Sequence, residues 1–370
     1  MKYQILQGDN RETLKTLADN SVDAIVTDPP YGIDFLGKSW DANTGALETY
    51  QECLRVLKPG GHILAFSAAR TYHHLAITLE QAGFEIRDQI MWIYSSGFPK
   101  SQDIGKSIQR SMGVKEYEEV AVDTTKNTGF GMTDHARVRA GEDWSTPATT
   151  VKKVIATDPE AVAWAGWGTA LKPAHEPIAL ARKPIKLSIA KNCQTHGVGA
   201  LNIDATRIER DQEEARFPSN VLGEILQADY QKYFYCPKVS RRERHIGFDD
   251  PGAQTRRARD EDGNVLNYAE KKAGASANVL VEQFQLSDAG NNHPTVKPIE
   301  LMKYLIKLIT PPGGTVLDPF NGSGSTGCAA VELGHTYIGC ELDPAYVDIA
   351  KKRIEAWNKQ DNTFEDLFEI

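Results

Sequence analysis

Hydrophobic and polar positions near the N-terminus alternate between two periods. Apolar runs of strand length occupy residues 3–8 and 22–28, and the stretch RETLKTLAD between them repeats its apolar residues at helical spacing. The pattern then predicts a helix within TYQECLRVLKPGG that stops at Pro-Gly-Gly, followed by the strand HILAFS. A helix over residues 71–82 and a strand near 88–94 continue the alternation. This order is typical of a parallel sheet with helices on both faces.

The alternation breaks in the middle of the chain and resumes near its end. Residues 113–165 are polar and lack sustained periodicity, which predicts a long, partly mobile loop, and residues 176–182 predict one further strand. From residue 299 the pattern predicts a helix, a strand, a glycine-rich turn that opens a helix, a strand and a last helix.

These elements predict a doubly wound, mostly parallel, Rossmann-like α/β fold. We expect one catalytic domain from residues 1–190 and 285–357, interrupted by an insertion at 191–284 and followed by an acidic tail at 358–370. A length of 370 residues is sufficient for such a domain with an insertion.

Composition excludes some classes of protein. A hydrophobic fraction of 41% and a charged fraction of 25% are ordinary for a soluble globular chain. The N-terminus does not resemble a signal peptide, and no apolar run reaches the roughly 18 residues of a membrane span, so we expect a cytoplasmic protein. The five cysteines form no CxxC pair, which suits neither a disulfide framework nor a zinc site.

Charge is distributed unevenly along the chain. The net charge is -8, yet residues 231–259 contain eight Lys or Arg against three acidic residues. The aromatic run Tyr233-Phe234-Tyr235 precedes this basic cluster, and together they are compatible with a phosphate-binding surface. A solvated charged helix beside a core strand would give the same pattern.

The tetrapeptide Asp28-Pro29-Pro30-Tyr31 ends an apolar run, so it should lie at the carboxyl end of a parallel strand, where open α/β sheets bind ligands. The exocyclic amino group of a base is a poor nucleophile because its lone pair is delocalised into the ring. Asp28 and the Pro29 carbonyl offer acceptors for its hydrogens, and paired prolines hold that carbonyl rigidly. Tyr31 offers a face on which an extruded base can stack. An ordinary strand-terminal turn is the alternative.

A glycine-rich turn, DPFNGSGSTG at 318–327, follows the expected strand TVLD. It contains G-x-G-x-x-G, and Glu341 ends the next strand nineteen positions beyond Gly322, where nucleotide-binding folds place an acid for ribose hydroxyls. A phosphate-binding P-loop is excluded because Cys328 stands where that motif needs Lys. A dinucleotide-dependent oxidoreductase remains a competitor, but it has no use for Asp-Pro-Pro-Tyr.

These motifs resemble those of the amino-group DNA methyltransferases, and their order is similar to that of the beta class. The resemblance extends along nearly the whole chain through Gly8-Asp9-Asn10, Leu57-Lys58-Pro59-Gly60-Gly61, Leu171 to Pro177 and Asn292 to Pro298. These phrases are most similar to methyltransferases of phages and prophages. The resemblance implies the methyltransferase fold, S-adenosylmethionine as cofactor, double-stranded DNA as substrate, and target recognition by residues 191–284.

The resemblance also implies roles for single residues. Asp9 would approach the cofactor adenine and Glu341 its ribose, while Thr295 and Lys297 would hold the methionine carboxylate. The implied cofactor-binding residues are Asp9, Thr295, Lys297, Asp318, Pro319, Phe320, Gly322, Ser323, Gly324, Glu341, Leu342 and Asp343. Asp9 could also cap the helix that follows it, and Lys297 could be an ordinary solvated lysine.

We predict DNA contacts from the loop after Tyr31 and from the basic cluster, by position alone. These residues are Lys38, Trp40, Lys238, Arg241, Arg242 and Arg244. No metal is expected, because a sulfonium is already an activated methyl donor and no cluster has ligand spacing.

The predicted reaction is base extrusion followed by direct in-line methyl transfer to the N6 of adenine. Cytosine N4 stays open as the alternative acceptor, because the same acceptor geometry serves either amino group. A DNA-binding relative without activity is a further alternative, which the intact Asp28 to Tyr31 motif disfavours. A homodimer and a cognate restriction endonuclease are partners that the resemblance brings into consideration.

Overall fold

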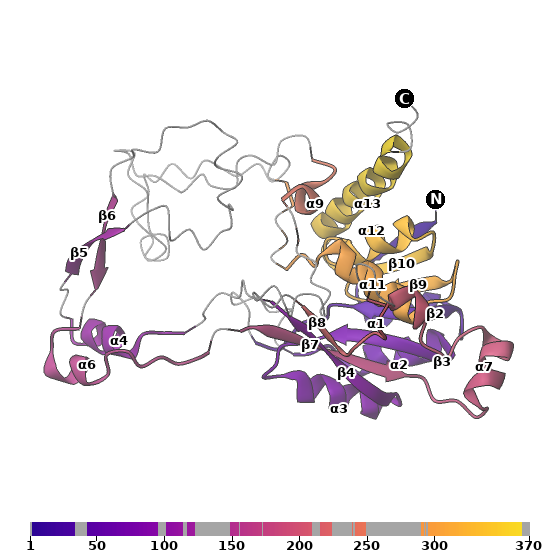
Figure 1. Ribbon diagram of the computed structural model, residues 1–370, viewed down its shortest axis with the longest axis horizontal. Helices are drawn as coiled ribbons and strands as arrows, with labels where there is room; N and C mark the ends of the chain where they lie inside the picture. The colour runs from indigo at the N-terminus through magenta and orange to yellow at the C-terminus, as the bar shows by residue number, and fades with distance from the viewer. Residues whose placement is uncertain are drawn as a thin grey trace. The chain divides into compact units, whose positions relative to one another are not determined.

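The computed structural model describes most of the chain. The described residues are 2–33, 43–94, 101–113, 117–122, 149–154, 156–171, 173–208, 215–223, 239, 241–248, 290, 291, 293 and 295–364. The chain forms two compact units, a larger one from Met1–Trp92 and Glu176–Ile370 and a smaller one from Ile93–His175. Figure 1 shows the elements of both units.

The larger unit is built on one eight-stranded sheet with the order β1-β10-β9-β2-β3-β7-β4-β8. Its strands are β1 (Tyr3–Gln7), β2 (Val22–Thr27), β3 (Leu57–Phe66), β4 (Glu85–Ile93), β7 (His175–Arg182), β8 (Val221–Gly223), β9 (Thr315–Asp318) and β10 (Thr336–Glu341). The pairs from β1 to β3 are parallel, whereas β7 runs antiparallel to β3. The predicted doubly wound, mostly parallel fold is confirmed.

Helices flank the sheet and connect its strands. They are α1 (Asn10–Thr13), the 3-10 turn η1 (Leu14–Thr16), α2 (Leu47–Val56), α3 (Tyr72–Ala82), α7 (Ile189–His196), the 3-10 turn η4 (Asp204–Thr206), α9 (Arg241–His245), α11 (Ile299–Ile309), α12 (Ser325–Glu332) and α13 (Pro344–Phe364). Among the described residues, no helix combines the length and apolar character needed to cross a membrane.

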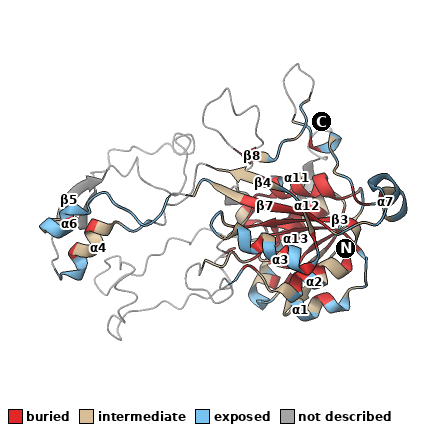
Figure 2. Ribbon diagram, turned by 90° about the horizontal axis from the view of Figure 1, so that it is seen from below, coloured by how far each residue is buried: buried red, intermediate tan, exposed pale blue. Residues whose placement is uncertain are grey.

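Strand β2 contributes side chains to the hydrophobic cores on both faces of the sheet. All six of its residues are buried. Its side chains alternate between two cores, with Val26 in the core that includes α11 and α12 and Ile25 in the core that includes α2 and α3. A strand covered on both faces needs a continuous apolar run, which is what the sequence contains. Figure 2 shows the buried residues concentrated in the sheet and on the helix faces against it.

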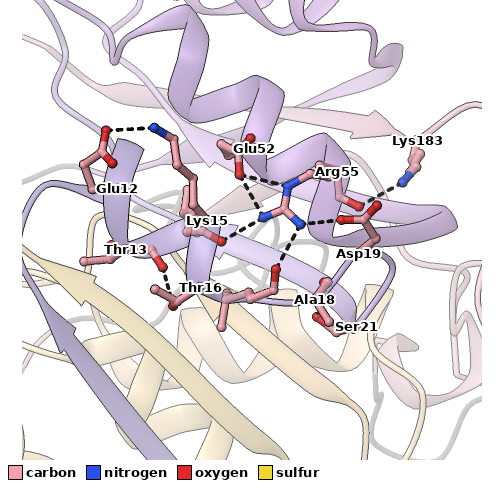
Figure 3. Close-up of polar contacts among 12 residues, drawn as sticks. Glu12, Thr13, Lys15, Thr16, Ala18, Asp19, Ser21, Glu52, Arg55 and Lys183 are labelled. Carbon is pink, nitrogen blue, oxygen red and sulfur yellow. Dashed lines mark hydrogen bonds and ion pairs between the residues drawn. The ribbon is translucent and has the colours of Figure 1, made fainter.

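Polar contacts join α2 to the segment around η1 and to Lys183 (Figure 3). Arg55 of α2 donates to the carbonyl oxygens of Leu14 and Leu17, both at 2.9 Å, and pairs with Glu52 at 2.8 Å. Lys183, just after β7, donates to the Leu57 carbonyl at 2.7 Å. These two cations therefore donate hydrogen bonds to backbone carbonyls of η1 and at the ends of η1 and α2.

The helix predicted to stop at Pro59-Gly60-Gly61 ends earlier than expected. Helix α2 stops at Val56, and β3 begins at Leu57 and runs through Lys58-Pro59-Gly60-Gly61. The register between β2 and β3 shifts at this point. Gly60 adopts a φ of +83°, and a Cβ on Gly61 would lie 2.9 Å from the Asp23 carbonyl. The Pro-Gly-Gly sequence thus makes a bulge within a strand rather than a helix stop.

The smaller unit contains regular elements inside the region predicted as an irregular loop. Strands β5 (Tyr117–Val122) and β6 (Thr149–Val154) pair antiparallel, and helices α4 (Ile104–Ser111) and α6 (Pro159–Ala163) lie on either side of them in the sequence. The buried Gln109 joins α4 to α6, because its amide oxygen accepts from the backbone N–H groups of Thr157 and Asp158, both at 3.1 Å. Local periodicity misses such strands because their partners lie far along the chain.

The structure adds regular elements to two other segments. Within the insertion predicted at 191–284, β8 joins the edge of the main sheet beside β4. Helix α13 continues to Phe364, into the segment predicted as a tail. Whether residues 191–284 read the DNA target stays a prediction.

Candidate active site

The residues that the motifs single out meet at one edge of the sheet. Asp28 follows the last residue of β2, Phe66 ends β3 and Asp318 ends β9. These three strands are parallel neighbours, so their carboxyl ends open on the same side. Strand β7 runs the opposite way and therefore brings its first residues, including Glu176, to that side.

Four polar side chains form what we call the Asp28 cluster: Asp28, Tyr31, Glu176 and Lys297. The Lys297 ammonium lies 2.5 Å from Asp28 Oδ2, 3.2 Å from the Tyr31 hydroxyl and 3.5 Å from Glu176 Oε2. The Tyr31 oxygen lies 2.8 Å from Asp28 Oδ1 and 2.9 Å from Glu176 Oε2. Lys297 has 7% of its side chain exposed, against 17% for Asp28 and 19% for Glu176. Substrate can therefore reach the carboxylates more readily than the ammonium.

Burial and charge act in opposite directions on Lys297. Burial favours the neutral amine, but the charges of Asp28 and Glu176 and the hydrogen bonds to them outweigh it and raise the pKa above its ordinary value. Burial first, and then the two carboxylates, raise the pKa of Tyr31 well above its ordinary value. The cluster therefore holds a permanent cation and a neutral phenol. The ammonium also lies 5.0 Å from the centre of the Phe66 ring, a cation–π contact.

The glycine-rich turn between β9 and α12 depends on its glycines. Gly322 and Gly324 have φ values of +51° and +80°, in the left-handed region that favours glycine. A Cβ on Gly322 would lie 2.8 Å from Nε2 of His293, and one on Gly324 would lie 3.0 Å from Ala350. The backbone can therefore turn closely here, as it must to lie against a bound nucleoside.

Asp318 is buried, and its carboxylate holds the turn through hydrogen bonds. Its carboxylate accepts from the hydroxyls of Thr27 and Thr326, each at 2.7 Å, and from the backbone N–H of Phe320 at 3.0 Å. Burial raises the pKa of Asp318 to about 6, although these hydrogen bonds favour the charged form. Asp318 thus shapes the turn, and it links the turn directly to the end of β2.

Glu341 closes the other side of the turn. Its Oε2 accepts from the Gly322 backbone N–H at 2.7 Å and its Oε1 from that of Asp343 at 2.9 Å. Burial raises the pKa of Glu341 to about 7. Because each carboxylate oxygen has a second lone pair, both remain able to accept from ribose hydroxyls.

Asp9 lies beside Glu341 and also caps a helix. Its carboxylate accepts from the Arg11 backbone N–H at 2.9 Å, as an N-cap of α1 does. The preceding Gly8 donates to the Glu341 carbonyl at 2.9 Å, because β1 and β10 are paired. The predicted adenine-side and ribose-side carboxylates therefore share one edge of the sheet. The remaining cofactor predictions also lie around the turn: Pro319, Ser323 and Leu342, the last with 64% exposure.

Lys297 and Thr295 occupy different surroundings from each other. The sequence predicts both at the methionine carboxylate, yet the structure commits the Lys297 ammonium to Asp28 and Glu176. Thr295 instead donates its backbone N–H to Nδ1 of His293, which covers Gly322. The sequence could not reveal that Glu176 and Asp28 meet at this ammonium, and the carboxylate-binding role of both residues stays a prediction.

The predicted DNA contacts are described only in part. Lys38, Trp40 and Lys238 lie outside the described residues, as do the side chains of Arg241 and Arg242.

The one predicted DNA contact whose side chain is described, Arg244, donates to the His293 carbonyl at 3.0 Å, and burial lowers the pKa of its guanidinium. Helix α9 packs inward through Glu243 and His245, at 8% and 6% exposure. Arg244 therefore supports the backbone at His293, and its contact with DNA stays a prediction.

Sequence reasoning assigned no role to two residues of the site. Glu176 lies in a phrase that carries the family resemblance, but only the antiparallel direction of β7 places it beside Asp28. Arg353 of α13 is fully buried and donates to the Ser323 carbonyl at 2.6 Å and to the Glu243 carbonyl at 3.1 Å. Its sequence context, KKRIEAW, resembles any charged helix face.

A parallel sheet with a glycine turn after β9, an acid after β10 and Asp-Pro-Pro-Tyr after β2 defines a group-transfer enzyme that uses a nucleoside cofactor. The chain belongs to the DNA methylase family, whose model matches residues 22–352. This membership confirms the predicted class, a DNA methyltransferase.

The chain is also similar to individual known proteins. The chain is 24% identical over 396 residues to the type II methyltransferase M.HindIII of Haemophilus influenzae, covering 95% of this chain and 94% of that protein. It is 41% identical over 70 residues to the DNA adenine methyltransferase YhdJ of Escherichia coli, covering 19% of this chain and 24% of that one. The crystal structure of the M1.HpyAVI–SAM complex aligns with a TM-score of 0.43 at 20% identity, covering 95% of this chain and 99% of that chain.

Within the part of the chain that the structure describes, no group of three or more His, Cys, Asp or Glu side chains is arranged to hold a metal ion.

Proposed function

We propose that the protein transfers the methyl group of S-adenosylmethionine to the exocyclic N6 of adenine in double-stranded DNA. The observation that carries this proposal is the placement of Asp28 at the sheet edge, beside the glycine turn that Asp318 and Glu341 shape. The carboxylate that would accept from the amino group of the base and the turn that would bind the cofactor then follow neighbouring parallel strands, β2 and β9.

Asp28 and the Pro29 carbonyl are the acceptors for the two amino hydrogens. Lys297 and Tyr31 each use one lone pair of an Asp28 oxygen, so each oxygen keeps a second one for the amino group. Accepting both hydrogens localises the lone pair on the amino nitrogen and directs it toward the methyl group. The hydrogen bond from Lys297 orients the carboxylate, so little reorganisation is needed when the base arrives.

Tyr31 is the proposed stacking face for the extruded base. Its hydroxyl is anchored by Asp28 and Glu176, and the ring packs against the core beneath the sheet edge. A ring held at both ends presents a fixed plane at a small entropic cost.

The residues around the turn fit an adenosyl cofactor. Glu341 would accept from the ribose hydroxyls, Asp9 would lie toward the adenine, and the backbone at Gly322 and Gly324 would lie against the nucleoside. Bound S-adenosylmethionine supplies a methyl group activated by its sulfonium charge, so no covalent intermediate with the protein is needed.

Adenine is the proposed base, and cytosine N4 is not preferred. The support is the local match to YhdJ, which is a DNA adenine methyltransferase. An oxidoreductase is not retained, because the family is DNA methylase. A homodimer, a restriction endonuclease partner and a phage origin remain predictions of the sequence alone.

The test is to incubate the protein with unmethylated genomic DNA and S-adenosylmethionine, digest the DNA and identify methylated nucleosides by mass spectrometry. Asp28→Ala should abolish the product, while Asp88→Ala, which changes an exposed carboxylate of β4, should leave it. N6-methyladenine that depends on Asp28 supports the proposal. N4-methylcytosine would overturn the choice of base, and no methylated nucleoside despite cofactor binding would overturn the reaction.

A further inference from the structure

The side chain of Asn10 joins helix α2 to the glycine-rich turn after β9. Its Nδ2 donates to the Pro319 carbonyl oxygen at 3.0 Å, and its Oδ1 accepts from the Thr49 hydroxyl at 2.8 Å. Asn10 is the first residue of α1, Thr49 belongs to α2, and Pro319 follows the last residue of β9. Three segments that are far apart in the sequence therefore meet at one amide group.

The partners of Asn10 determine which way its amide faces. A carbonyl oxygen can only accept a hydrogen bond, so the amide group that faces Pro319 is the NH2 group. The amide oxygen then faces Thr49, whose hydroxyl donates to it. Thr49 is 1% exposed, so its hydroxyl is held in place by the packing of α2. Thr49 therefore fixes the orientation in which Asn10 can donate to the turn.

The peptide group between Pro319 and Phe320 is held at both of its polar ends. Its carbonyl oxygen accepts from Asn10, and its N–H donates to Asp318 Oδ1 at 3.0 Å. The C=O and N–H of a trans peptide point in opposite directions, so a rotation of this peptide plane would break both hydrogen bonds. Asn10 therefore does for the carbonyl what Asp318 does for the N–H.

The orientation of this peptide determines where the next residues of the turn lie. The ring of Phe320 lies beside Tyr50 of α2, with 6.3 Å between the ring centres. Gly322, two residues further on, adopts a φ of +51° and donates its N–H to Glu341 at 2.7 Å. The backbone that we propose lies against the nucleoside thus begins from a peptide that Asn10 holds.

We propose that Asn10 is a positioning residue for S-adenosylmethionine. Its amide holds the carbonyl group at the start of the cofactor turn, and Thr49 holds the amide. Asn10 acts through Pro319 and Phe320 rather than by contact with the reacting atoms. This inference rests on the proposed function, and it adds α1 and α2 to the elements that shape the cofactor site.

The alternative role for Asn10 is to stabilise α1 itself. Asp9 already caps this helix by accepting from the Arg11 backbone N–H at 2.9 Å, and the two Asn10 hydrogen bonds described above lead out of the helix. A carboxylate in the first turn of a helix is favourable because the helix dipole is positive there. Asn10→Asp therefore separates the two roles, since it suits the helix but places an acceptor oxygen against the Pro319 carbonyl.

The experiment measures equilibrium binding of S-adenosylmethionine and S-adenosylhomocysteine by isothermal titration calorimetry. The variants are Asn10→Ala, Asn10→Asp and Thr49→Val, the last of which keeps the shape of the side chain and removes its hydroxyl. S-adenosylhomocysteine lacks the sulfonium charge, so it excludes attraction between the new carboxylate and a positive ligand as a cause. Thermal melting without ligand shows that each variant is folded.

Asn192 of α7 offers a matched control. It is 1% exposed, and its Nδ2 donates to the Pro59 carbonyl at 2.8 Å, so Asn192→Ala also removes a hydrogen bond to a proline carbonyl. Pro59 lies near the start of β3, whereas the cofactor turn follows the carboxyl end of β9, and both strands run parallel to β2. Asn192→Ala should therefore lower the melting temperature and leave both affinities unchanged.

We expect Asn10→Ala to weaken binding of both ligands about tenfold, the effect of one hydrogen bond. Asn10→Asp should weaken binding on the order of 100-fold, because a repelling oxygen replaces the donor. Thr49→Val should weaken it about threefold, since the amide keeps its donor but loses its fixed orientation. At saturating S-adenosylmethionine, the methylation rate of Asn10→Ala should stay within about threefold of wild type, because Asp28 is unchanged.

Asn10→Asp that binds both ligands as tightly as wild type would assign Asn10 to α1 and overturn the inference. The same follows if Asn10→Ala loses no more affinity than Asn192→Ala, and this comparison decides the question even where Asn10→Asp does not fold. A wild type that binds both ligands but methylates no base overturns only the proposed reaction, because the inference is measured by affinity. A wild type that binds neither ligand overturns both.

Discussion

Lys297 holds two carboxylates together in a part of the protein that water barely reaches. Its ammonium lies 2.5 Å from Asp28 and 3.5 Å from Glu176, so it neutralises one negative charge and orients both side chains. Without it, the two carboxylates would repel each other across the hydroxyl that they share. The reactive state of Asp28 therefore depends on a residue far away in sequence.

The variant Lys297→Met should lower the methyl-transfer rate at saturating cofactor about 100-fold, because Asp28 loses the ammonium that orients its carboxylate. S-adenosylmethionine affinity should change by less than about threefold. Single-turnover kinetics and equilibrium cofactor binding measure the two effects, with the exposed Lys351→Met as control. A large loss of cofactor affinity with the rate retained would instead support the methionine-carboxylate role.

Glu341 makes the stability of the protein depend on pH. Burial raises its pKa from 4.5 to about 7, so the folded state holds a proton that the unfolded state releases at a lower pH. The contribution to stability is full below about pH 4.5 and is lost as the pH rises toward 7.

We expect Glu341→Gln to remove the pH-dependent contribution that Glu341 makes to the free energy of unfolding. The difference between the unfolding free energies of wild type and variant should change by about 3 kcal/mol from pH 4.5 to above 7, which corresponds to the shift at 1.36 kcal/mol per unit. Denaturant titrations at several pH values measure it. A difference that stays constant across this range would show that Glu341 titrates alike in both states.

At the scale of elements, Arg353 links three pieces of the site from within α13. Its Nη1 donates to the Ser323 carbonyl at 2.6 Å and the Ser325 hydroxyl at 3.3 Å, and its Nη2 donates to the Glu243 carbonyl at 3.1 Å. Glu243 in turn accepts the first backbone N–H of α11. The glycine turn, α9 and α11 are therefore held in one arrangement by a single buried guanidinium.

The variant Arg353→Met leaves two buried carbonyls without this donor, each costing about 1–3 kcal/mol. We predict lower thermal stability and S-adenosylmethionine binding weakened about tenfold, because the turn loses its support. Calorimetry of cofactor binding tests this against Lys351→Met on the exposed face of the same helix. Unchanged affinity would mean that the turn keeps its shape without Arg353.

The sequence predicted the elements that carry their own periodicity or their own motif. The run VDAIVT, the turn at Gly322 and Gly324, and the acid Glu341 were located correctly because each is encoded by neighbouring residues. The role of Glu176 could not be predicted, because it follows from the direction of β7 beside β3. Arg353 was missed for the same reason, since its partners are more than twenty residues away in the chain.

At the scale of the molecule, the first and last residues of the smaller unit lie next to each other. The Tyr94 backbone N–H donates to the Ala174 carbonyl at 2.9 Å, so the chain leaves and re-enters side by side. A short linker can close such a gap at little entropic cost.

Replacing residues 101–171 by a short Gly-Ser linker should therefore leave the larger unit folded. S-adenosylmethionine should raise the melting temperature of the shortened protein as much as that of the full chain, because the turn and Glu341 lie in the larger unit. Differential scanning fluorimetry measures the shift. Loss of the cofactor-induced shift would show that the smaller unit contributes to the cofactor site.

The order of strands also determines when the sheet can be completed during synthesis of the chain. Strand β2 pairs on one side with β3, which follows closely, but on the other side with β9, and β1 pairs with β10. The ribosome therefore releases the Asp-Pro-Pro-Tyr segment long before the strands that complete its sheet. Until then the early strands have an unpaired edge, which invites chaperones or wrong neighbours. A nascent chain that stops before β9 therefore lacks both β9 and β10, which pair with β2 and β1 in the finished sheet.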